Sequence, residues 1–222
     1  VELAAKFYEA QLFDADGRRY LDAYNNVPSV GHSHPRVVAA MAEQAATITT
    51  HTRYLSEATV AYAEDLLGTL PADIGNVMFT CTGSEANDLA LRIAKLATGG
   101  TGVIVTTNAY HGVTTEVAAI SPSLGGLGSV ADWVRVVDPT DFAAGVGAAL
   151  ESFAEAGIRP AALIIDTILA SDGVIAEIDG LADAVAAVRA VGGLFIADEV
   201  QPGFGRLGTG MWGVDRYGIV PD

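Results

Sequence analysis

VMFTCTGSEAND, residues 77–88, joins an apolar run typical of a strand to a segment typical of a helix N-terminus. Gly83 lies between them and allows a tight turn and a close approach of the backbone to a ligand. Ser84 is expected at the N-cap and Glu85 in the first turn, where free N–H groups and the helix dipole favour an anion. The stretch predicts a phosphate-binding turn, although the same residues could form a helix cap with no ligand.

A second stretch, GLFIADEVQPGFGR at residues 193–206, ends an apolar run with two adjacent carboxylates, Asp198 and Glu199. Acidic residues at the carboxyl end of a strand lie where α/β sheets bind ligands. A carboxylate at this point can also be a purely structural cap, so the stretch alone leaves both interpretations open. No histidine is near these carboxylates in the sequence, and we expect no metal site.

From residue 61 onward, segments typical of strands and helices alternate along the chain. Expected strands cover 76–81, 102–107, 134–137, 161–166 and 194–198, and expected helices cover 61–70, 84–97, 142–155 and 181–191. This order predicts an α/β fold, with a mostly parallel sheet and helices on both faces. Cys81, in the first of these strands, is expected to be an inert core thiol.

The first 60 residues have a different pattern. Phe13 to Tyr20 predicts a hairpin with Asp-Gly as its turn, and residues 35–47 predict a helix with proline at an early position. We therefore divide the chain into residues 1–60, part of a small α+β domain, and residues 61–222, a larger ligand-binding domain.

Together these stretches resemble the class III aminotransferases, pyridoxal 5'-phosphate (PLP) enzymes with the aspartate aminotransferase fold, called fold type I. The residues that carry the resemblance are Tyr20-Leu-Asp22, Gly31-His-Ser-His-Pro35, Thr82-Gly-Ser-Glu-Ala-Asn87, Tyr110-His-Gly112 and Asp198-Glu-Val-Gln201-Pro-Gly-Phe-Gly-Arg206. They occur in the order found in the family. Several intervening stretches look closest to the subgroup that includes ethanolamine-phosphate phospho-lyase.

The resemblance implies how the cofactor phosphate and one face of its ring are held. Gly83 and Ser84 match the phosphate-binding turn. Tyr110 matches the aromatic residue that stacks on the pyridine ring, and His111, beside it in the sequence, is expected to be a cofactor-binding residue too.

The resemblance also implies how the ring is activated. Asp198 matches the acid that pairs with the pyridine nitrogen and keeps it protonated, so that the ring can act as an electron sink. Val200 matches the residue on the opposite ring face, and Gln201 the group near the ring hydroxyl. Asn26 falls near the substrate entrance of the family. Arg53 and Tyr54 fall near its dimer interface, from which a partner's site could be reached, and all three are candidate substrate residues.

One essential group of the family is missing from the sequence. Such enzymes hold PLP as a Schiff base with a lysine, and this chain has two lysines, Lys6 and Lys95. Neither matches the position of the family's lysine, which follows shortly after the Pro-Asp pair represented here by Pro221-Asp222. We therefore expect the chain to be the N-terminal half of a longer enzyme.

Three functions remain open. The first is an aminotransferase that moves an amino group between an amine or amino acid and a 2-oxo acid. The second is a PLP-dependent phospho-lyase acting on a phosphoethanolamine-type amine. The third is a non-catalytic fragment or binding subunit that lacks the lysine. Asp166 stands where much of the family has a longer glutamate, which puts the contacts of this position towards Gln201 or the cofactor in doubt.

Composition excludes several other classes. The formal net charge of −15 argues against a nucleic-acid partner, because such proteins need basic patches. No apolar stretch approaches the ~20 residues that span a bilayer, and no membrane association is expected. A single cysteine rules out an intramolecular disulfide, and a cytoplasmic location is the expectation. The family resemblance implies a homodimer.

Overall fold

A parallel sheet of four strands, in the order β5-β4-β6-β7, organises the larger of two compact units, which are Val1–Gly68 and Thr69–Asp222. The computed structural model describes residues 6–8, 10–24, 28–51, 53–173 and 177–222. The strands of this sheet are β4 (Gly102–Thr106), β5 (Val134–Val137), β6 (Pro160–Asp166) and β7 (Leu194–Asp198). The predicted α/β fold with a parallel sheet is confirmed.

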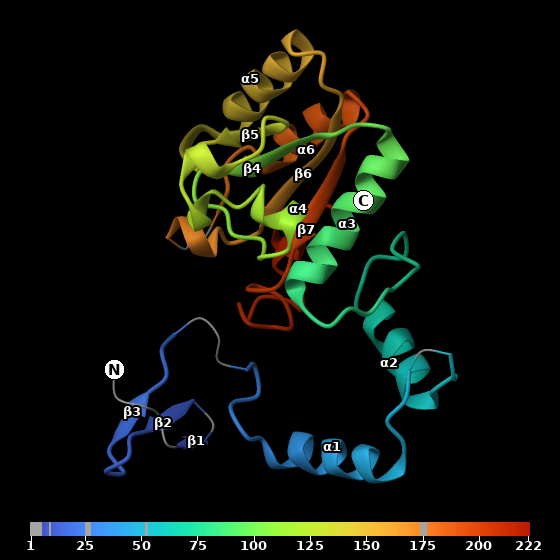
Figure 1. The fold of residues 1–222 in the computed structure, drawn as a ribbon, viewed down its shortest axis with the longest axis vertical. Coiled ribbons are helices and arrows are strands. Elements are labelled where there is room, and N and C mark those ends of the chain that lie inside the picture. Colours follow the sequence, from blue (N-terminus) through green and yellow to red (C-terminus); the bar gives the residue numbers. More distant parts are fainter. Residues whose placement is uncertain (1–5, 9, 25–27, 52, 174–176) are drawn as a thin grey trace. The chain divides into compact units, whose positions relative to one another are not determined.

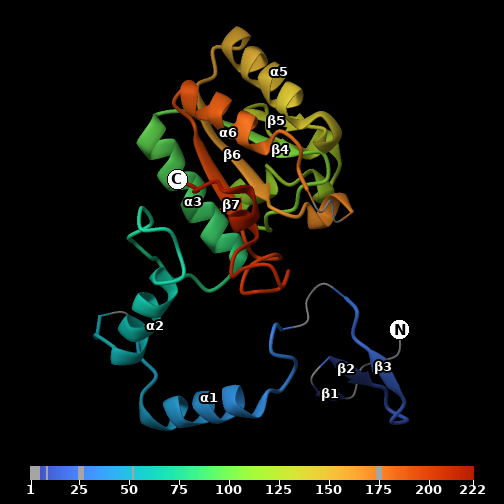
Figure 2. The same cartoon turned by 180° about the vertical axis from the view of Figure 1, so that it is seen from behind.

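Helices cover both faces of the sheet, as the two opposite views show (Figures 1 and 2). Helix α3 (Gly83–Thr98) packs on one face, and α5 (Phe142–Glu155) and α6 (Leu181–Ala190) pack on the other. Every residue of β4 is buried, as expected for a strand covered on both sides. The remaining short elements are α4 (Thr115–Ala118), η1 (Pro122–Leu124), η2 (Leu127–Ser129), η3 (Pro139–Asp141), η4 (Ala170–Asp172) and η5 (Gly213–Tyr217).

Helix α3 begins one residue earlier than the sequence suggested. Thr82, and not Ser84, is the N-cap, because its side chain accepts a hydrogen bond from the backbone N–H of Glu85. The Glu85 carboxylate in turn accepts one from the backbone N–H of Cys81, which stabilises the entry to the helix. Gly99, in a left-handed conformation, ends the helix. Ser84 therefore lies inside the first turn.

The predicted strand at 76–81 was wrong. The structure forms no strand over these described residues, and a strand persists only where its N–H and C=O groups pair with a neighbour. Met78 is 65% exposed and Cys81 is also exposed, so the expectation of a core thiol was wrong as well. The other predicted elements of this unit agree with the observed ones within a few residues at each end.

The first unit contains a three-stranded antiparallel sheet and two helices. Its strands are β1 (Lys6–Tyr8), β2 (Gln11–Phe13) and β3 (Arg19–Leu21), and its helices are α1 (Pro35–Thr47) and α2 (Glu57–Leu67). The predicted hairpin is formed by β2 and β3, and the Asp14 carboxylate closes it by accepting from the N–H of Arg18 and the hydroxyl of Tyr20. The predicted helix at 35–47 has the expected bounds, whereas the second helix begins four residues earlier than expected.

Candidate functional site

Asp198 is the last residue of β7, at the carboxyl edge of the parallel sheet. It pairs in register with Asp166, the last residue of β6. The loop that contains Tyr110 and His111 follows β4, whose neighbours β5 and β6 lie on opposite sides of it. Open α/β sheets bind ligands at this edge, near the strand where the order reverses.

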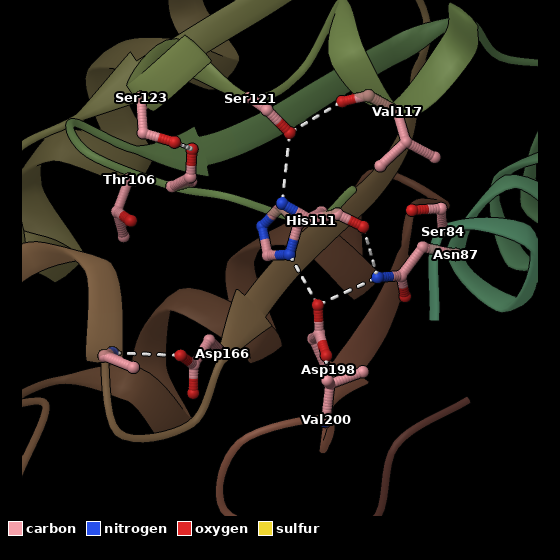
Figure 3. A network of polar contacts seen from close by, with 12 residues as sticks. Ser84, Asn87, Thr106, His111, Val117, Ser121, Ser123, Asp166, Asp198 and Val200 are labelled. Atoms are coloured by element: carbon pink, nitrogen blue, oxygen red, sulfur yellow. Dashed lines mark hydrogen bonds and ion pairs between the residues drawn. The ribbon is translucent and has the colours of Figure 1, made fainter. Parts of the chain in front are cut away.

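Three donors hold the Asp198 carboxylate, and Figure 3 shows two of these contacts. Its Oδ2 lies 2.8 Å from Nδ1 of His111 and accepts a 2.8 Å hydrogen bond from Nδ2 of Asn87. Its Oδ1 accepts a 3.0 Å hydrogen bond from the backbone N–H of Val200. Asp198 is only 5% exposed, so these donors replace most of the water that a free carboxylate would bind.

The donors also decide the charge of Asp198. Burial alone would raise the pKa of this carboxyl. The hydrogen bond and charge interaction with His111 oppose that effect, together with the hydrogen bonds from Val200 and Asn87, and the net result is a lowered pKa. Asp198 is therefore a buried carboxylate that stays ionised at neutral pH.

His111 lies beneath the loop and not at its surface. Its side chain is 1% exposed, and its backbone N–H donates to Oγ of Ser121, which itself donates to the carbonyl of Val117. Within the described residues, Nε2 of His111 has no hydrogen-bond partner. The polar contact of the ring in the chain is therefore with Asp198 through Nδ1.

The N-terminus of α3 packs closely against this site. A Cβ on Gly83 would lie 2.9 Å from Cγ2 of Val200, so only glycine fits there without movement. The Ser84 hydroxyl accepts from the backbone N–H of Val113 and so fastens the loop after β4 to the helix. Thr82 supplies acceptors for the N–H groups of Glu85 and Ala86, and the helix itself provides none for those of Gly83 and Ser84.

The remaining predicted site residues have varied surroundings. Tyr110 is 48% exposed and Val200 is 63% exposed, which leaves both side chains accessible to a ligand, and Gln201 is partly buried. Arg53 and Tyr54 are exposed residues of the first unit, where the Tyr54 ring stacks on His51. Asn26 lies outside the described residues.

Two further carboxylates near the site have structural partners. Asp166, where the sequence departs from the family, accepts hydrogen bonds from the backbone N–H groups of Ile168 and Ala170. Burial is the main cause that raises its pKa. Glu199 accepts from the backbone N–H groups of Gly213 and Val214, and burial raises its pKa too. Both side chains organise loops at the edge of the sheet.

Asn87 was missed as a site residue by the sequence analysis. The buried positions of α3 are Asn87, Leu91, Ala94 and Thr98, a spacing that follows one face of a helix. The amide of Asn87 on this mostly apolar face was the available signal, because a buried amide needs hydrogen-bond partners.

Lys95 lies away from this site and has its own contacts. Its ammonium pairs with Glu116 and lies 3.8 Å from the ring centroid of Trp133. Lys95 lies eleven positions after Ser84 in the helix, which corresponds to about 16 Å along the axis. Over the described ranges, no three His, Cys, Asp or Glu side chains form a group that could hold a metal, and no helix combines the length and hydropathy that a bilayer crossing needs.

Known proteins similar to this chain include aminotransferases and phospho-lyases. Residues 4–222 match the family model described as aminotransferase class III. The chain is 38% identical to an alanine–glyoxylate aminotransferase 2-like protein of Drosophila melanogaster, over 95% of this chain and 47% of the relative. It is 36% identical to ethanolamine-phosphate phospho-lyase homolog 1 of Caenorhabditis elegans, over 95% of this chain and 52% of the relative. The chain thus spans about half the length of the curated relatives it matches.

Two solved structures of related enzymes share the fold of this chain. A phospholyase from Arthrobacter in complex with phosphoethanolamine superimposes with a TM-score of 0.93 at 38% identity, over 99% of this chain and 56% of that one. A taurine:2-oxoglutarate aminotransferase from Bifidobacterium kashiwanohense, in complex with PLP and glutamate, gives a TM-score of 0.84 at 27% identity, over 100% of this chain and 55% of that one.

Proposed function

The chain belongs to the class III aminotransferase family, and on this premise we propose that it carries the PLP-binding part of an aminotransferase. The enzyme would move an amino group between an amine or amino acid and a 2-oxo acid. The observation that carries the proposal is the buried, ionised Asp198 at the carboxyl end of β7, held by donors from three segments.

The residues present fit PLP. The α3 N-terminus offers the N–H groups of Gly83 and Ser84 to a phosphate, and Gly83 has no room for a side chain there. Tyr110 and Val200 expose an aromatic and an aliphatic surface that a pyridine ring can pack between, and Gln201 would lie near the ring hydroxyl. When bound, the cofactor supplies an electron sink for the pair left by breaking a C–H bond of the amine.

The chain's own contribution is electrostatic and geometric. Asp198 would hold a proton on the pyridine nitrogen, because its lowered pKa keeps it anionic and its burial strengthens the interaction. His111 and Asn87 restrain the carboxylate before any ligand arrives, so little reorganisation is needed on binding. Asn26, Arg53 and Tyr54 remain proposed substrate-side residues.

The proposal is tested by purifying the longest natural chain that contains these residues and incubating it with PLP, a panel of amines and amino acids, and a 2-oxo acid. Formation of a new amino acid from the oxo acid, dependent on PLP and lost in Asp198→Asn, is expected. PLP binding with no amino transfer to any acceptor would favour the non-catalytic alternative.

A phospho-lyase is the second candidate, and it is supported by the TM-score of 0.93 with the Arthrobacter phospholyase, against 0.84 with the Bifidobacterium aminotransferase. A lyase converts its substrate and one water molecule into phosphate, ammonia and an aldehyde, and it needs no oxo acid. Phosphate release from phosphoethanolamine with PLP and no oxo acid would select this function over transamination.

Three broader features stay proposals. We propose a homodimer, which light scattering coupled to size exclusion would test. A cytoplasmic location rests on cysteine usage, and fractionation of producing cells would test it. The division into residues 1–60 and 61–222 also remains a prediction, which limited proteolysis would test.

A further inference from the structure

Asn87 is a polar side chain on the buried face of α3, and it is 6% exposed. Its Nδ2 group donates to Oδ2 of Asp198 at 2.8 Å and to the carbonyl oxygen of His111 at 2.9 Å. A side-chain amide nitrogen carries two N–H bonds, so both are used. The orientation of the amide is fixed by these contacts, because an oxygen in the same place could donate to neither acceptor.

The position of Asn87 links two parts of the site. The carboxylate lies at the end of β7, and the His111 carbonyl lies in the loop after β4 (Figure 3). Asn87 contacts both through one nitrogen atom, from a third element. Rotation of the Asp198 carboxylate would break this hydrogen bond together with those from His111 and Val200.

We propose that Asn87 is a positioning residue for Asp198: its amide fixes the direction of the carboxylate and locks it to the loop that carries Tyr110 and His111. The proposal rests on the proposed function, in which Asp198 pairs with the pyridine nitrogen. Asn87 itself need not touch the cofactor. As a neutral donor it supplies a hydrogen bond to the anion without adding a charge of its own.

The first experiment needs no cofactor and no variant. In protein labelled with 15N at asparagine, the two Nδ2 protons of Asn87 should exchange with solvent about tenfold or more slowly than those of Asn76 and Asn108, which are exposed. Exchange of the Asn87 protons as fast as that of these internal references would overturn the proposal.

The second experiment follows the titration of the Asp198 carboxyl carbon by 13C NMR in the chain without PLP. Asn87→Leu keeps the approximate size but removes both N–H donors, and the Asp198 midpoint should move upwards. Thr98→Val is the matched control, because Thr98 is buried on the same face of α3 and hydrogen-bonds Ala94 and Gly100 far from the carboxylate. An unchanged midpoint in Asn87→Leu, or an equal change in Thr98→Val, would contradict the proposal.

A third experiment tests the consequence for the cofactor. Pyridoxamine 5'-phosphate labelled with 15N in its ring should show a protonated ring nitrogen on the wild-type protein and a shift towards the unprotonated signal on Asn87→Leu. Binding to the wild type with no ring protonation would sink the assigned role of Asp198, and hence the proposed function, while the first two experiments still decide the role of Asn87. Equal ring protonation in both proteins would count against Asn87 alone.

Discussion

Asp166 and Asp198 occupy paired positions at the ends of two adjacent parallel strands, yet their surroundings shift their pKa values in opposite directions. Burial dominates at Asp166, which accepts hydrogen bonds from the backbone N–H groups of Ile168 and Ala170 in its own loop, and the pKa rises. At Asp198 the effects of His111, Val200 and Asn87 together outweigh burial, and the pKa falls. At the edge of the sheet, Asp166 therefore binds a proton more readily than a free aspartate, and the adjacent Asp198 binds one less readily.

The stability of the two variants Asp166→Asn and Asp198→Asn should depend on pH with opposite sign. An unfolded aspartate titrates near about 3.9. The contribution of Asp198 is present above that value and is lost as the pH falls through its lower folded pKa, so Asp198→Asn should be most destabilising near neutral pH. The cost of ionising Asp166 appears as the pH rises through its higher folded pKa, so Asp166→Asn should be most destabilising in acid.

Urea unfolding of both variants and the wild type, between pH 3 and pH 7, measures these differences. Parallel stability curves for the three proteins would show that neither carboxyl has the environment described.

Asp198→Asn should reduce amino transfer on the order of 100-fold or more, because it removes the negative charge that we propose pairs with the pyridine nitrogen. Its effect on PLP affinity should be much smaller, since the proposed phosphate contacts, the N–H groups of Gly83 and Ser84, lie on α3 and are unchanged. Single-turnover rates with a donor amine and equilibrium binding of PLP provide the two measurements. Asp132→Asn, at an exposed position, is the control and should change neither quantity. Unchanged single-turnover deamination in Asp198→Asn would remove the assigned role.

Gly83→Ala should destabilise the protein by about 1–3 kcal/mol, because the new Cβ would meet Val200 at 2.9 Å. The control is Gly147→Ala within α5, where a Cβ meets nothing within 4 Å and should stabilise by roughly 0.5–1 kcal/mol. Chemical denaturation of both variants gives the comparison. Val200→Ala should rescue much of the loss at Gly83, and strict additivity of the two substitutions would argue against the contact.

Gly112→Ala should be more damaging still, by more than about 3 kcal/mol. Gly112 has φ of +133°, and a Cβ there would lie 2.7 Å from Cα of Ser84, which is backbone and cannot swing away. Gly157→Ala has the positive φ without the crowding and should cost only about 1–2 kcal/mol. Thermal unfolding distinguishes the two, and similar melting temperatures for both variants would show that the packing against Ser84 is unimportant.

Most of the second unit could be predicted from sequence because its signals are local. The apolar runs of β4, β5 and β7 and the helical periodicity of α5 gave bounds that match the structure almost residue for residue. The segment at 76–81 has the same β-prone composition, but strand formation depends on a pairing neighbour, which composition does not encode. The N-cap of α3 was misplaced because Thr82 and Ser84 are both good caps, and only the contact with Glu85 separates them.

The candidate site was predictable in part. Asp198 could be found as a strand-end acid, and Gly83 as a turn before a helix. The link between His111 and Asp198 joins residues 87 positions apart, and that between Asn87 and Asp198 joins residues 111 apart. No periodicity or local motif records such a contact. The family resemblance assigned roles to His111 and Asp198 separately, but the pair is a property of the folded chain.

The wide separation of these donors has a consequence for how the protein is made. Asn87 and His111 are synthesised well before Asp198, their common acceptor. Their hydrogen bonds to Asp198 can therefore form only after β7 has joined the sheet. Contacts of such high sequence separation tend to form late in folding, because the loop between them must close first. If PLP pairs with Asp198 as proposed, it can do so only in a chain whose sheet has formed through β7. Cofactor binding during biosynthesis would then depend on the addition of β7 to the sheet.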